Sequence, residues 1–317
     1  MMKIYLMGSD QRIVRCARVS FAKDSYVDEK RDKRLIRYLF KHRHASPFEH
    51  NIIAFEWKKE KWIELLSKLE NPTVQVYYSN GFVFLNLRNA INVWELLPDA
   101  VKERIKEAFP TTYGVIQRRG EIEDEELYSL PYTKDKAYVK EKIETSSGWI
   151  GLVDKLELET DMDFYTFVVE CPLFVARQWM RHRFGSYNEV SKRYVGKEFL
   201  EFYLPKYIRK QAEKNKQASV DEPISESEVF IKKIENLISK SVKLYEEIIE
   251  KGGAKELARG VLPQFMKTRF YWTVPRISLD NFITLRTHEG AQKEIREFAE
   301  AIKEMVGYRG TDKKNVI

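Results

Sequence analysis

The sequence has 317 residues, of which 43% are hydrophobic and 32% are charged, and its net charge is +7. A chain of this length can bury a sizeable core, and it contains no long uncharged apolar run that could span a membrane. The positive charge suits a protein that binds anions, such as nucleotides or nucleic acid. Two cysteines, Cys16 and Cys171, and the absence of a recognisable leader favour a reducing cytoplasm without disulfides.

The first 57 residues predict two short extended segments separated by a helix. Residues 14–21 are expected to form a strand or turn. A helix should follow from about Asp28, because apolar residues recur on one face at helical spacing. Pro47 should take the chain out of this helix, and residues 52–57 alternate in polarity like a strand.

Three histidines and a glutamate lie close together around Pro47. His42, His44, Glu49 and His50 could ligate zinc or iron, since imidazole and carboxylate groups bind both metals. Their spacing matches no recognised metal motif, and no second cluster supplies the remaining ligands. We therefore expect no metal site. His42 and His50 could instead be ordinary histidines whose hydrogen bonds are satisfied near a helix end.

Residues 58–163 predict a helix, a β-hairpin and a second helix. Asn80-Gly81 separates two β-rich runs, which is a strong signal for a type I′ hairpin. Residues 110–147 are expected to be a mostly polar connection. Residues 165–169 should then form a strand that leads into a helix at Pro172, where a missing N–H is harmless.

The segment from residue 176 to residue 194 is rich in hydrogen-bond donors. The helix from Pro172 should end near Gly185, with Arg181, His182 and Arg183 in its last turn and residues 186–193 in a following loop. Guanidinium groups pair with phosphates and carboxylates, so this segment predicts a site for an anionic ligand. A solvated basic face is the alternative, but the interleaved amides and aromatic residues argue against it.

The C-terminal part predicts long helices and one strand. Residues 209–228 should be an exposed loop, followed by a long amphipathic helix that stops at Gly252-Gly253 and packs its apolar side inward. Residues 269–274 should form a strand that Pro275 breaks. Ser278 should cap a helix that carries Leu279, Phe282 and Leu285 on one face, and a last helix should close the fold.

Several separated motifs resemble the flavin-dependent thymidylate synthases. Arg181-His182-Arg183 is followed eight positions later by Ser191, and residues 174–179 and 188–194 also match that family closely. Further similar blocks are residues 17–20, 44–50, 258–263 and 281–296. The resemblance implies an α+β fold with a helix-rich subunit around a twisted antiparallel sheet. On this view residues 1–317 form a single domain with a large insertion at about residues 58–163.

The resemblance also implies a reaction and an assembly. Family members methylate dUMP to dTMP with methylenetetrahydrofolate as carbon donor and NADPH-reduced FAD as hydride carrier. They use no cysteine nucleophile, and they form homotetramers whose active sites are shared between chains. It thus implies a cytoplasmic enzyme that binds dUMP, NADPH and folate, without a membrane or a specific nucleic acid as partner.

The same resemblance assigns roles to individual residues. Arg286 is the expected catalytic residue, because it would stabilise negative charge on the pyrimidine. The expected dUMP contacts are Gln178, Trp179, Met180, Arg181, Glu189, Val190, Ser191, Lys192, Arg193, Arg259 and Arg286. The expected FAD contacts are Ser46, Arg181, His182, Arg183, Glu189, Asn281 and Arg276.

One motif departs from the family pattern. Family members carry Asn-x-Arg before the helix that contains Asn281, whereas this chain has Pro275-Arg276-Ile277. Arg276 could replace the missing arginine from one position away. Alternatively, Asn86 and Arg88 in the insertion reproduce the spacing and supply part of the flavin contacts. Chance spacing on a surface helix is a further explanation.

Other functions remain possible from the residues alone. A basic nucleic-acid-binding protein would use the same arginines and aromatic rings, and a structural domain would use them for oligomer contacts. Ser191 could act as a nucleophile, but no neighbouring base is placed to deprotonate it, so phosphate or sugar binding is the expected role. The similar blocks extend over both sides of the insertion, which favours the synthase.

Overall fold

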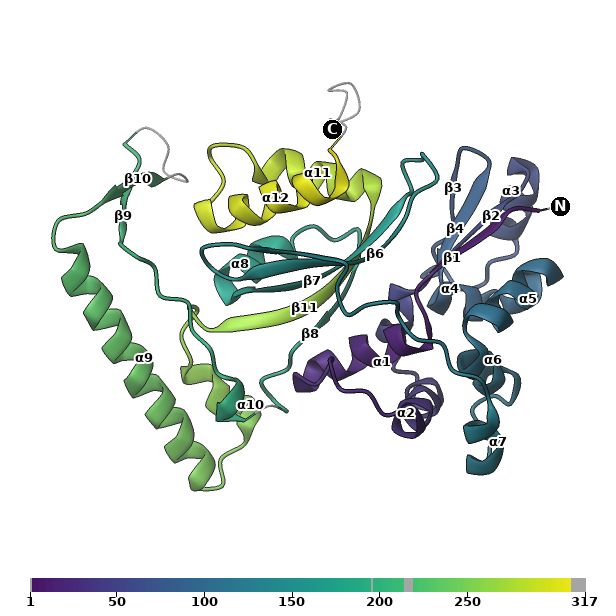
Figure 1. Cartoon of the computed structure of the whole chain (residues 1–317), viewed down its shortest axis with the longest axis horizontal. Helices are drawn as coiled ribbons and strands as arrows, with labels where there is room; N and C mark the ends of the chain where they lie inside the picture. Colours follow the sequence, from purple (N-terminus) through teal and green to yellow (C-terminus); the bar gives the residue numbers. More distant parts are fainter. Residues whose placement is uncertain (1, 195, 214–218, 309–317) are drawn as a thin grey trace.

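The computed structural model describes residues 2–194, 196–213 and 219–308, and within them it is an α+β protein whose sheets are antiparallel. A five-stranded sheet with the order β5-β6-β7-β11-β8 lies at the centre, and a four-stranded sheet with the order β1-β2-β4-β3 lies beside it (Figure 1). Each of these two sheets lies against a large hydrophobic core of its own. The expected α+β class is therefore confirmed.

The N-terminal module contains the smaller sheet and most of the short helices. Its strands pack against the helices around buried Ile53, Phe55 and Val83, which are fully inaccessible to solvent. Its elements are β1 (Ile4–Met7), α1 (Asp10–Arg18), the 3-10 helix η1 (Val19–Phe21), α2 (Glu29–Lys41), the 3-10 helix η2 (Ser46–His50), β2 (Ile52–Glu56), α3 (Lys59–Ser67), β3 (Tyr77–Ser79), β4 (Phe82–Asn86), α4 (Leu87–Asn92), the 3-10 helix η3 (Trp94–Leu96), α5 (Asp99–Ala108), α6 (Pro110–Gln117) and α7 (Asp124–Ser129).

The C-terminal module contains the central sheet, with α11 and α12 over one of its faces and α9 at one end of the molecule (Figure 1). Trp179, Trp272 and Phe282 are fully buried between the sheet and these helices. Its elements are β5 (Glu141–Glu144), β6 (Trp149–Leu156), β7 (Phe164–Pro172), α8 (Leu173–Trp179), β8 (Ser186–Glu189), the 3-10 helix η4 (Lys197–Phe199), β9 (Arg209–Gln211), β10 (Ser219–Pro223), α9 (Ser227–Glu250), α10 (Lys255–Ala258), the 3-10 helix η5 (Arg259–Val261), β11 (Lys267–Pro275), α11 (Arg276–Arg286) and α12 (Lys293–Val306).

Several predicted elements are confirmed. These are the helix from about Asp28, the strand at residues 52–57, and the hairpin at Asn80-Gly81, where both residues have the positive φ that a type I′ turn requires. The strand at residues 165–169, which is part of β7, and the last helix are also confirmed. In each case the local pattern agrees with the tertiary packing, so sequence periodicity was a sufficient guide.

The predicted strand or turn at residues 14–21 is wrong, because this segment belongs to α1 and η1. The Ser9 side chain caps the helix by accepting from the backbone N–H of Arg12, and Asp10 lies in the first turn. The buried residues include Arg12 and Arg15 as well as Ile13 and Val14. Burial of these two charged residues obscured the apolar face that would have identified the helix.

The connection predicted at residues 110–147 is also wrong in part, since it contains α6, α7 and β5. Residues 209–228, predicted as a loop, include the small antiparallel pair β9 and β10. Ser278 does not cap α11, because the helix begins at Arg276 after Pro275. Leu285 is 51% exposed and does not share the buried face of Leu279 and Phe282.

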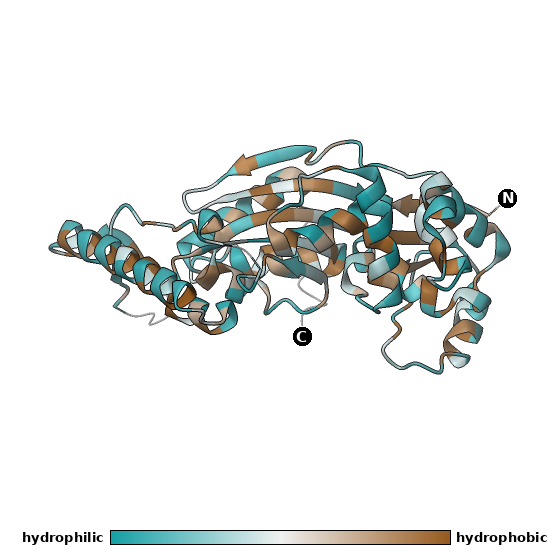
Figure 2. Cartoon of the chain, turned by 90° about the horizontal axis from the view of Figure 1, so that it is seen from below, coloured by the Kyte–Doolittle hydropathy of each residue, from teal (hydrophilic) through white to brown (hydrophobic). Residues whose placement is uncertain are grey.

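Helix α9 departs from its predicted packing. It has the expected length and ends before Gly252, whose φ of +82° suits a glycine. The side expected to pack inward is only partly covered: Tyr245 is buried near η5 and α10, whereas Phe230 is 41% exposed and Leu244 46% exposed. Leu237, at 57%, is also exposed. Figure 2 shows α9 lying at one end of the molecule with apolar and polar residues alternating along it.

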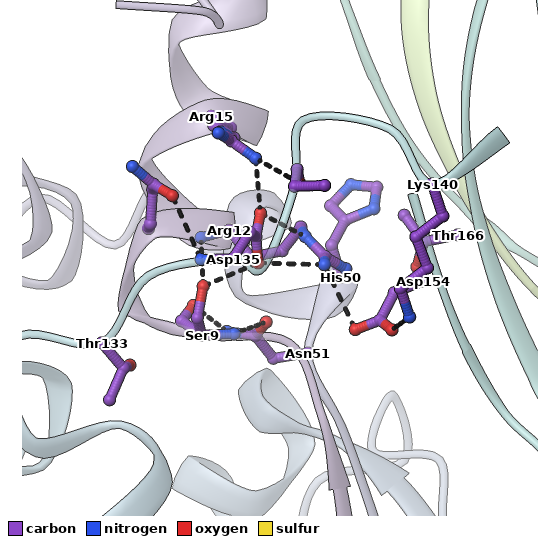
Figure 3. A network of polar contacts seen from close by, with 12 residues as sticks. Ser9, Arg12, Arg15, His50, Asn51, Thr133, Asp135, Lys140, Asp154 and Thr166 are labelled. Atoms are coloured by element: carbon purple, nitrogen blue, oxygen red, sulfur yellow. Dashed lines mark hydrogen bonds and ion pairs between the residues drawn. The ribbon is translucent and has the colours of Figure 1, made fainter. Parts of the chain in front are cut away.

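A buried ion cluster joins the two modules. The Arg12 guanidinium, at 2% side-chain exposure, donates to Asp135 at 3.0 Å and to Asp154 at 3.2 Å, and Arg15 donates to Asp135 at 3.0 Å (Figure 3). Asp135 also accepts from the hydroxyl of Ser9 at 2.7 Å. Since Asp154 lies on β6 and Arg12 on α1, this cluster fixes the N-terminal module against the central sheet.

We expect Asp135→Asn to destabilise the protein strongly. The variant leaves two buried arginines with one fewer negative charge, and breaking such pairs lowers the free energy of unfolding by roughly 3–5 kcal/mol. Urea unfolding followed by circular dichroism measures the change. Glu64→Gln, which removes an exposed pair with Lys61 and Lys68, is the control and should leave the midpoint unchanged. Equal midpoints for both variants would contradict the role of the cluster.

Candidate functional site

The arginine motif lies in a turn and not in a helix. Helix α8 ends at Trp179, so Arg181, His182 and Arg183 follow it, and the predicted loop at residues 186–193 begins as strand β8. The helix stops early because the Trp179 ring is buried among Phe270, Trp272 and Phe282, after which the chain reverses to pair with β11. No glycine or proline marks this end, so the sequence pattern missed it.

The turn is held against the central sheet by backbone contacts. The Tyr187 hydroxyl, on β8, donates to the backbone oxygen of His182 at 2.8 Å. A Cβ at Gly185 would lie 2.8 Å from Nε1 of Trp272 and 3.1 Å from the backbone oxygen of Thr273, so only glycine fits there without a shift. These contacts present Arg181 and Arg183 to solvent, and neither makes a hydrogen bond or ion pair within the described chain.

His182 and Arg286 form a direct contact. The Arg286 Nε–H donates to Nε2 of His182 at 3.1 Å, and another Arg286 N–H donates to the backbone oxygen of Gln178 at 3.0 Å. Burial and the neighbouring positive charge of Arg286 lower the pKa of His182 from 6.5 to about 4. His182 is therefore neutral near pH 7, and it orients the predicted catalytic arginine.

A pocket of about 270 Å³ opens beside this turn, and we call it the motif pocket. Its lining combines residues of the arginine motif with residues of the predicted insertion. Arg88 forms an ion pair with Glu49 across it, and the rings of Tyr77 and Phe184 lie 5.1 Å apart at their centroids. The residues that line it are Glu49, Ile52, Thr73, Gln75, Tyr77, Asn86, Arg88, Asn89, Phe164, Arg183, Phe184, Gly185, Ser186, Thr273 and Pro275.

A second pocket, of about 400 Å³, lies at the other end of β8, and we call it the basic pocket. Arg177, Lys192 and Arg259 surround the carboxylate of Glu189. Burial raises the pKa of Glu189, against a 2.6 Å hydrogen bond from Thr268 and the attraction of the nearby cations. The other lining residues are Leu173, Val190, Gly260, Leu262, Gln264, Met266 and Thr268. The net positive lining suits an anion such as a phosphate.

The remaining predicted dUMP residues lie in different surroundings. The Trp179 side chain is fully buried, so a contact with dUMP at this position would have to come from the backbone. The Ser191 hydroxyl accepts from the backbone N–H of Arg193 at 3.4 Å, and Lys192 donates to the backbone oxygen of Phe199 at 3.0 Å. The Gln178 side chain donates to Gln292 at 2.6 Å. Met180 is the cap residue that follows α8, and Arg193 is exposed.

The predicted FAD residues also divide between two places. Ser46 lies next to β8, where it accepts a hydrogen bond from Asn188, and Asn281 is exposed on α11. Arg276 is buried at 5% exposure, with its guanidinium bonded to Asp280, to the Tyr165 hydroxyl and to two backbone oxygens. The structure therefore does not bring Arg276 to the arginine motif, whereas Asn86 and Arg88 line the motif pocket together with Arg183.

The sequence analysis gave no individual role in binding dUMP or FAD to Arg177, His50, Asn188 or Thr273, although Arg177 and Asn188 lie in the segment that it predicted to bind an anion. His50, Asn188 and Thr273 form a hydrogen-bonded series behind Ser46. The position of His50 at the end of the motif block 44–50 was the sequence feature that could have marked it as a site residue. A larger open hollow of about 1310 Å³ lies between α12 and strands β5, β9 and β10, and none of the predicted residues lines it.

Across the described ranges, no three histidine, cysteine, aspartate or glutamate residues are grouped as metal ligands would be. Cys16 and Cys171 are both buried free thiols, and burial raises the pKa of each well above its usual value. No described helix is both long and apolar enough to cross a membrane.

Comparison with models of known protein families shows which family the chain is related to. The model of a family described as "Thymidylate synthase complementing protein" matches residues 4–60 and 156–308. The chain belongs to this family. The two matched segments contain both sides of the site, from Ser46 and Glu49 to Arg181, Arg259 and Arg286, and residues 61–155 lie between them. The family expected from the arginine motif is confirmed.

Curated relatives match over part of their length. A flavin-dependent thymidylate synthase of Thermosipho africanus is 46% identical over 138 residues, covering 43% of this chain and 59% of the relative. One from Thermus thermophilus is 44% identical over 151 residues, covering 47% of this chain and 54% of the relative. The chain thus spans slightly more than half of the length of these relatives.

A solved structure covers more of the chain at lower similarity. The UMP/dUMP methylase PolB from Streptomyces cacaoi, bound with 5-Br UMP, is 20% identical and covers 96% of this chain and 88% of its own. The TM-score is 0.40, which does not establish a common fold.

We expect His182 to make the stability of this family member depend on pH. The unfolded histidine has a pKa of 6.5 and the folded one about 4, so the unfolded state binds more protons between these values. Stability should fall as pH drops from 6.5 to 4. His50, whose pKa burial also lowers to about 4, contributes in the same direction. Chemical unfolding across this range should therefore give a shallower slope for His182→Gln, and identical slopes would contradict the prediction.

Proposed function

We propose that the protein is a flavin-dependent thymidylate synthase, a methyltransferase that converts dUMP to dTMP. Its co-substrates would be methylenetetrahydrofolate as carbon donor and NADPH as reductant of a bound FAD. The observation that supports this most is the arrangement at β8. The unpaired Arg181 and Arg183 lie at one end of the strand, with Arg286 beside them, and the basic pocket lies at the other end. The cytoplasm, where thiols stay reduced, is the compartment we assign.

The basic pocket is the proposed site for the phosphate and sugar of dUMP. Arg177, Lys192 and Arg259 would neutralise the phosphate, and the Glu189 carboxylate would accept a hydrogen bond from a sugar hydroxyl. Ser191 and Arg193 lie in the turn that follows β8 and would bind at its rim. Ser191 stays a binding residue in this proposal, because no base in hydrogen-bond contact would deprotonate it.

The donor set around the arginine motif fits a flavin dinucleotide. Arg181 and Arg183 offer two guanidinium groups without protein partners in the described chain, and Ser46 and Ser186 add hydroxyls, which suits the paired phosphates and polar groups of FAD. When bound, the flavin supplies the hydride. Arg286 would face the pyrimidine, where its charge stabilises negative charge that develops on the base. The neutral His182 and the Gln178 backbone oxygen hold that arginine in place.

We also propose that the functional unit is a homotetramer with shared active sites. The four residues of β8 separate the motif pocket from the basic pocket by roughly 13 Å. Two pockets on one chain could therefore belong to two active sites completed by neighbouring chains. The large apolar side chains that α9 exposes, among them Phe230, Leu237 and Leu244, support association, since monomers rarely expose large apolar patches. Light scattering should give a mass four times the 37.6 kDa of the chain.

Absorption spectroscopy of the purified protein tests the function. We expect a flavin spectrum, or its appearance after FAD is added, and bleaching by NADPH without oxygen at a rate that dUMP changes. Formation of dTMP on addition of methylenetetrahydrofolate completes the test. A colourless protein that fails to take up FAD would contradict the proposal. Salt-sensitive binding of nucleic acid by that protein would favour the alternative function.

The predicted insertion at residues 58–163 has a proposed role in flavin binding. Arg88, at the start of α4, reaches Glu49 in a family motif block, and both line the motif pocket with Arg183. The Asn86 side chain caps α4 by accepting from the backbone N–H of Asn89 at 2.9 Å, which orients Arg88. We propose that Arg88 replaces the arginine missing before α11, since Arg276 is engaged elsewhere.

Arg88→Ala should weaken FAD binding by roughly tenfold to a hundredfold, because a charged hydrogen bond to a ligand is worth roughly 1.5–3 kcal/mol. Fluorescence titration with FAD measures the affinity. Arg104→Ala is the matched control, since Arg104 is an exposed arginine of the same region that pairs with Glu107. Unchanged affinity in the Arg88 variant would contradict this role.

A further inference from the structure

Ser46 is joined to the interior of the central sheet by an unbroken series of hydrogen bonds. Asn188 Nδ2 donates to Ser46 Oγ at 3.2 Å, and Asn188 Oδ1 lies 3.0 Å from Nε2 of His50. On the other side of its ring, Nδ1 of His50 lies 2.8 Å from Thr273 Oγ1, which lies 2.8 Å from Thr166 Oγ1. The series joins η2, β8, β11 and β7, three of them neighbours in one sheet.

For each hydrogen bond in this series, the donor and the acceptor can be assigned. His50 is fully buried and neutral, since burial and the nearby Arg12 lower its pKa to about 4, so it carries one ring proton. Figure 3 shows its ring beside Arg12, with Thr166 on the sheet beyond. If Nε2 carries the proton, His50 donates to Asn188 and accepts from Thr273, and Thr166 donates to Thr273. Every proton in the series then has an acceptor.

The other tautomer of His50, with its proton on Nδ1, leaves one buried hydroxyl proton of the series without an acceptor. With the proton on Nδ1, Thr273 would donate to Thr166, whose own hydroxyl proton would then need a further acceptor. Thr166 is 0% exposed, and its hydroxyl makes no other hydrogen bond in the described part of the chain. An unpaired buried donor is costly, so the first direction is favoured.

We infer that Thr166, Thr273, His50 and Asn188 form a directional series of positioning residues that makes Ser46 a hydrogen-bond donor to the bound ligand. Because Ser46 Oγ already accepts from Asn188, its own proton is directed away from the protein. Ser46 is exposed next to β8, the strand that follows the arginine motif, so its proton is available to a ligand bound along β8, where we propose that the flavin lies. The series thus selects a ligand that presents an acceptor atom at Ser46. The inference rests on the proposed function.

The first test needs no ligand. Nitrogen-15 NMR of the wild-type protein reports which ring nitrogen of His50 carries the proton. The inference expects a protonated Nε2 and an unprotonated Nδ1, with no titration of the ring near neutral pH. The opposite tautomer, or a charged ring at pH 7, would overturn it.

The second test reverses the last hydrogen bond. In Asn188→Asp the carboxylate can still accept from His50 but cannot donate, so the Ser46 hydroxyl would donate to it and be lost to the ligand. FAD binding, measured by fluorescence titration, should weaken about fivefold to tenfold in Asn188→Asp and in Ser46→Ala. Ser46→Thr keeps the hydroxyl and should bind as the wild type does.

The double variant Ser46→Ala with Asn188→Asp separates this role from charge repulsion. It should bind FAD no more weakly than the worse single variant, whereas repulsion by the new carboxylate would add to the loss. Additive losses, or wild-type affinity in Asn188→Asp, would overturn the inference alone. Failure of the wild-type protein to bind FAD would overturn the proposed function as well, and thermal unfolding without FAD checks that each variant is folded.

Discussion

The burial of Arg12 is the constraint on which the arrangement of the two modules depends. A guanidinium at 2% exposure is tolerated only because Asp135 and Asp154 neutralise it, and these carboxylates come from the connection and from the central sheet. Helix α1 therefore has one position in which its charge is satisfied. The same position brings η2, with Ser46 and His50, against strand β8. Figure 3 shows His50 beside the Arg12 cluster.

The site follows from what this contact places beside β8. The strand is short and lies at the edge of the sheet, so its residues are accessible to the N-terminal module on one side. The arginine motif precedes β8 and contributes to the motif pocket, and the basic segment that follows β8 contributes to the basic pocket. The pockets that we propose for the nucleotide and for the flavin are therefore separate on one chain, which is the physical basis for the proposed shared assembly. Neutral His182 and His50 contribute positioning and not charge, because burial and neighbouring arginines lower the pKa of each ring and keep it from taking up a second proton.

Periodic sequence patterns predicted helices and strands correctly where the buried residues are apolar. They failed where charged residues are buried. The hairpin at Asn80-Gly81 and helices α2 and α12 were predictable because turn chemistry and apolar spacing agreed with the final packing. Helix α1 was not, since two of its buried side chains are arginines. The end of α8 at Trp179 could not be predicted from the sequence either. No helix-breaking residue stands there, and the burial of Trp179 determines where the helix ends. For α9 the apolar pattern predicted a helix correctly but could not say that the described chain covers its apolar side only in part.

The sequence by itself determined the family, and it supplied many of the candidate site residues, because motif residues carry their chemistry wherever they are placed. It also determined the positive charge and the absence of a metal-like spacing near Pro47. Only the tertiary structure decided which residues meet. Arg276 is buried and donates to Asp280 and Tyr165. Arg88 forms an ion pair with Glu49, and Asn188 forms hydrogen bonds with both Ser46 and His50. Most of these contacts join residues tens to hundreds of positions apart, and hydrogen-bond satisfaction in the folded chain selects them, which no local pattern encodes.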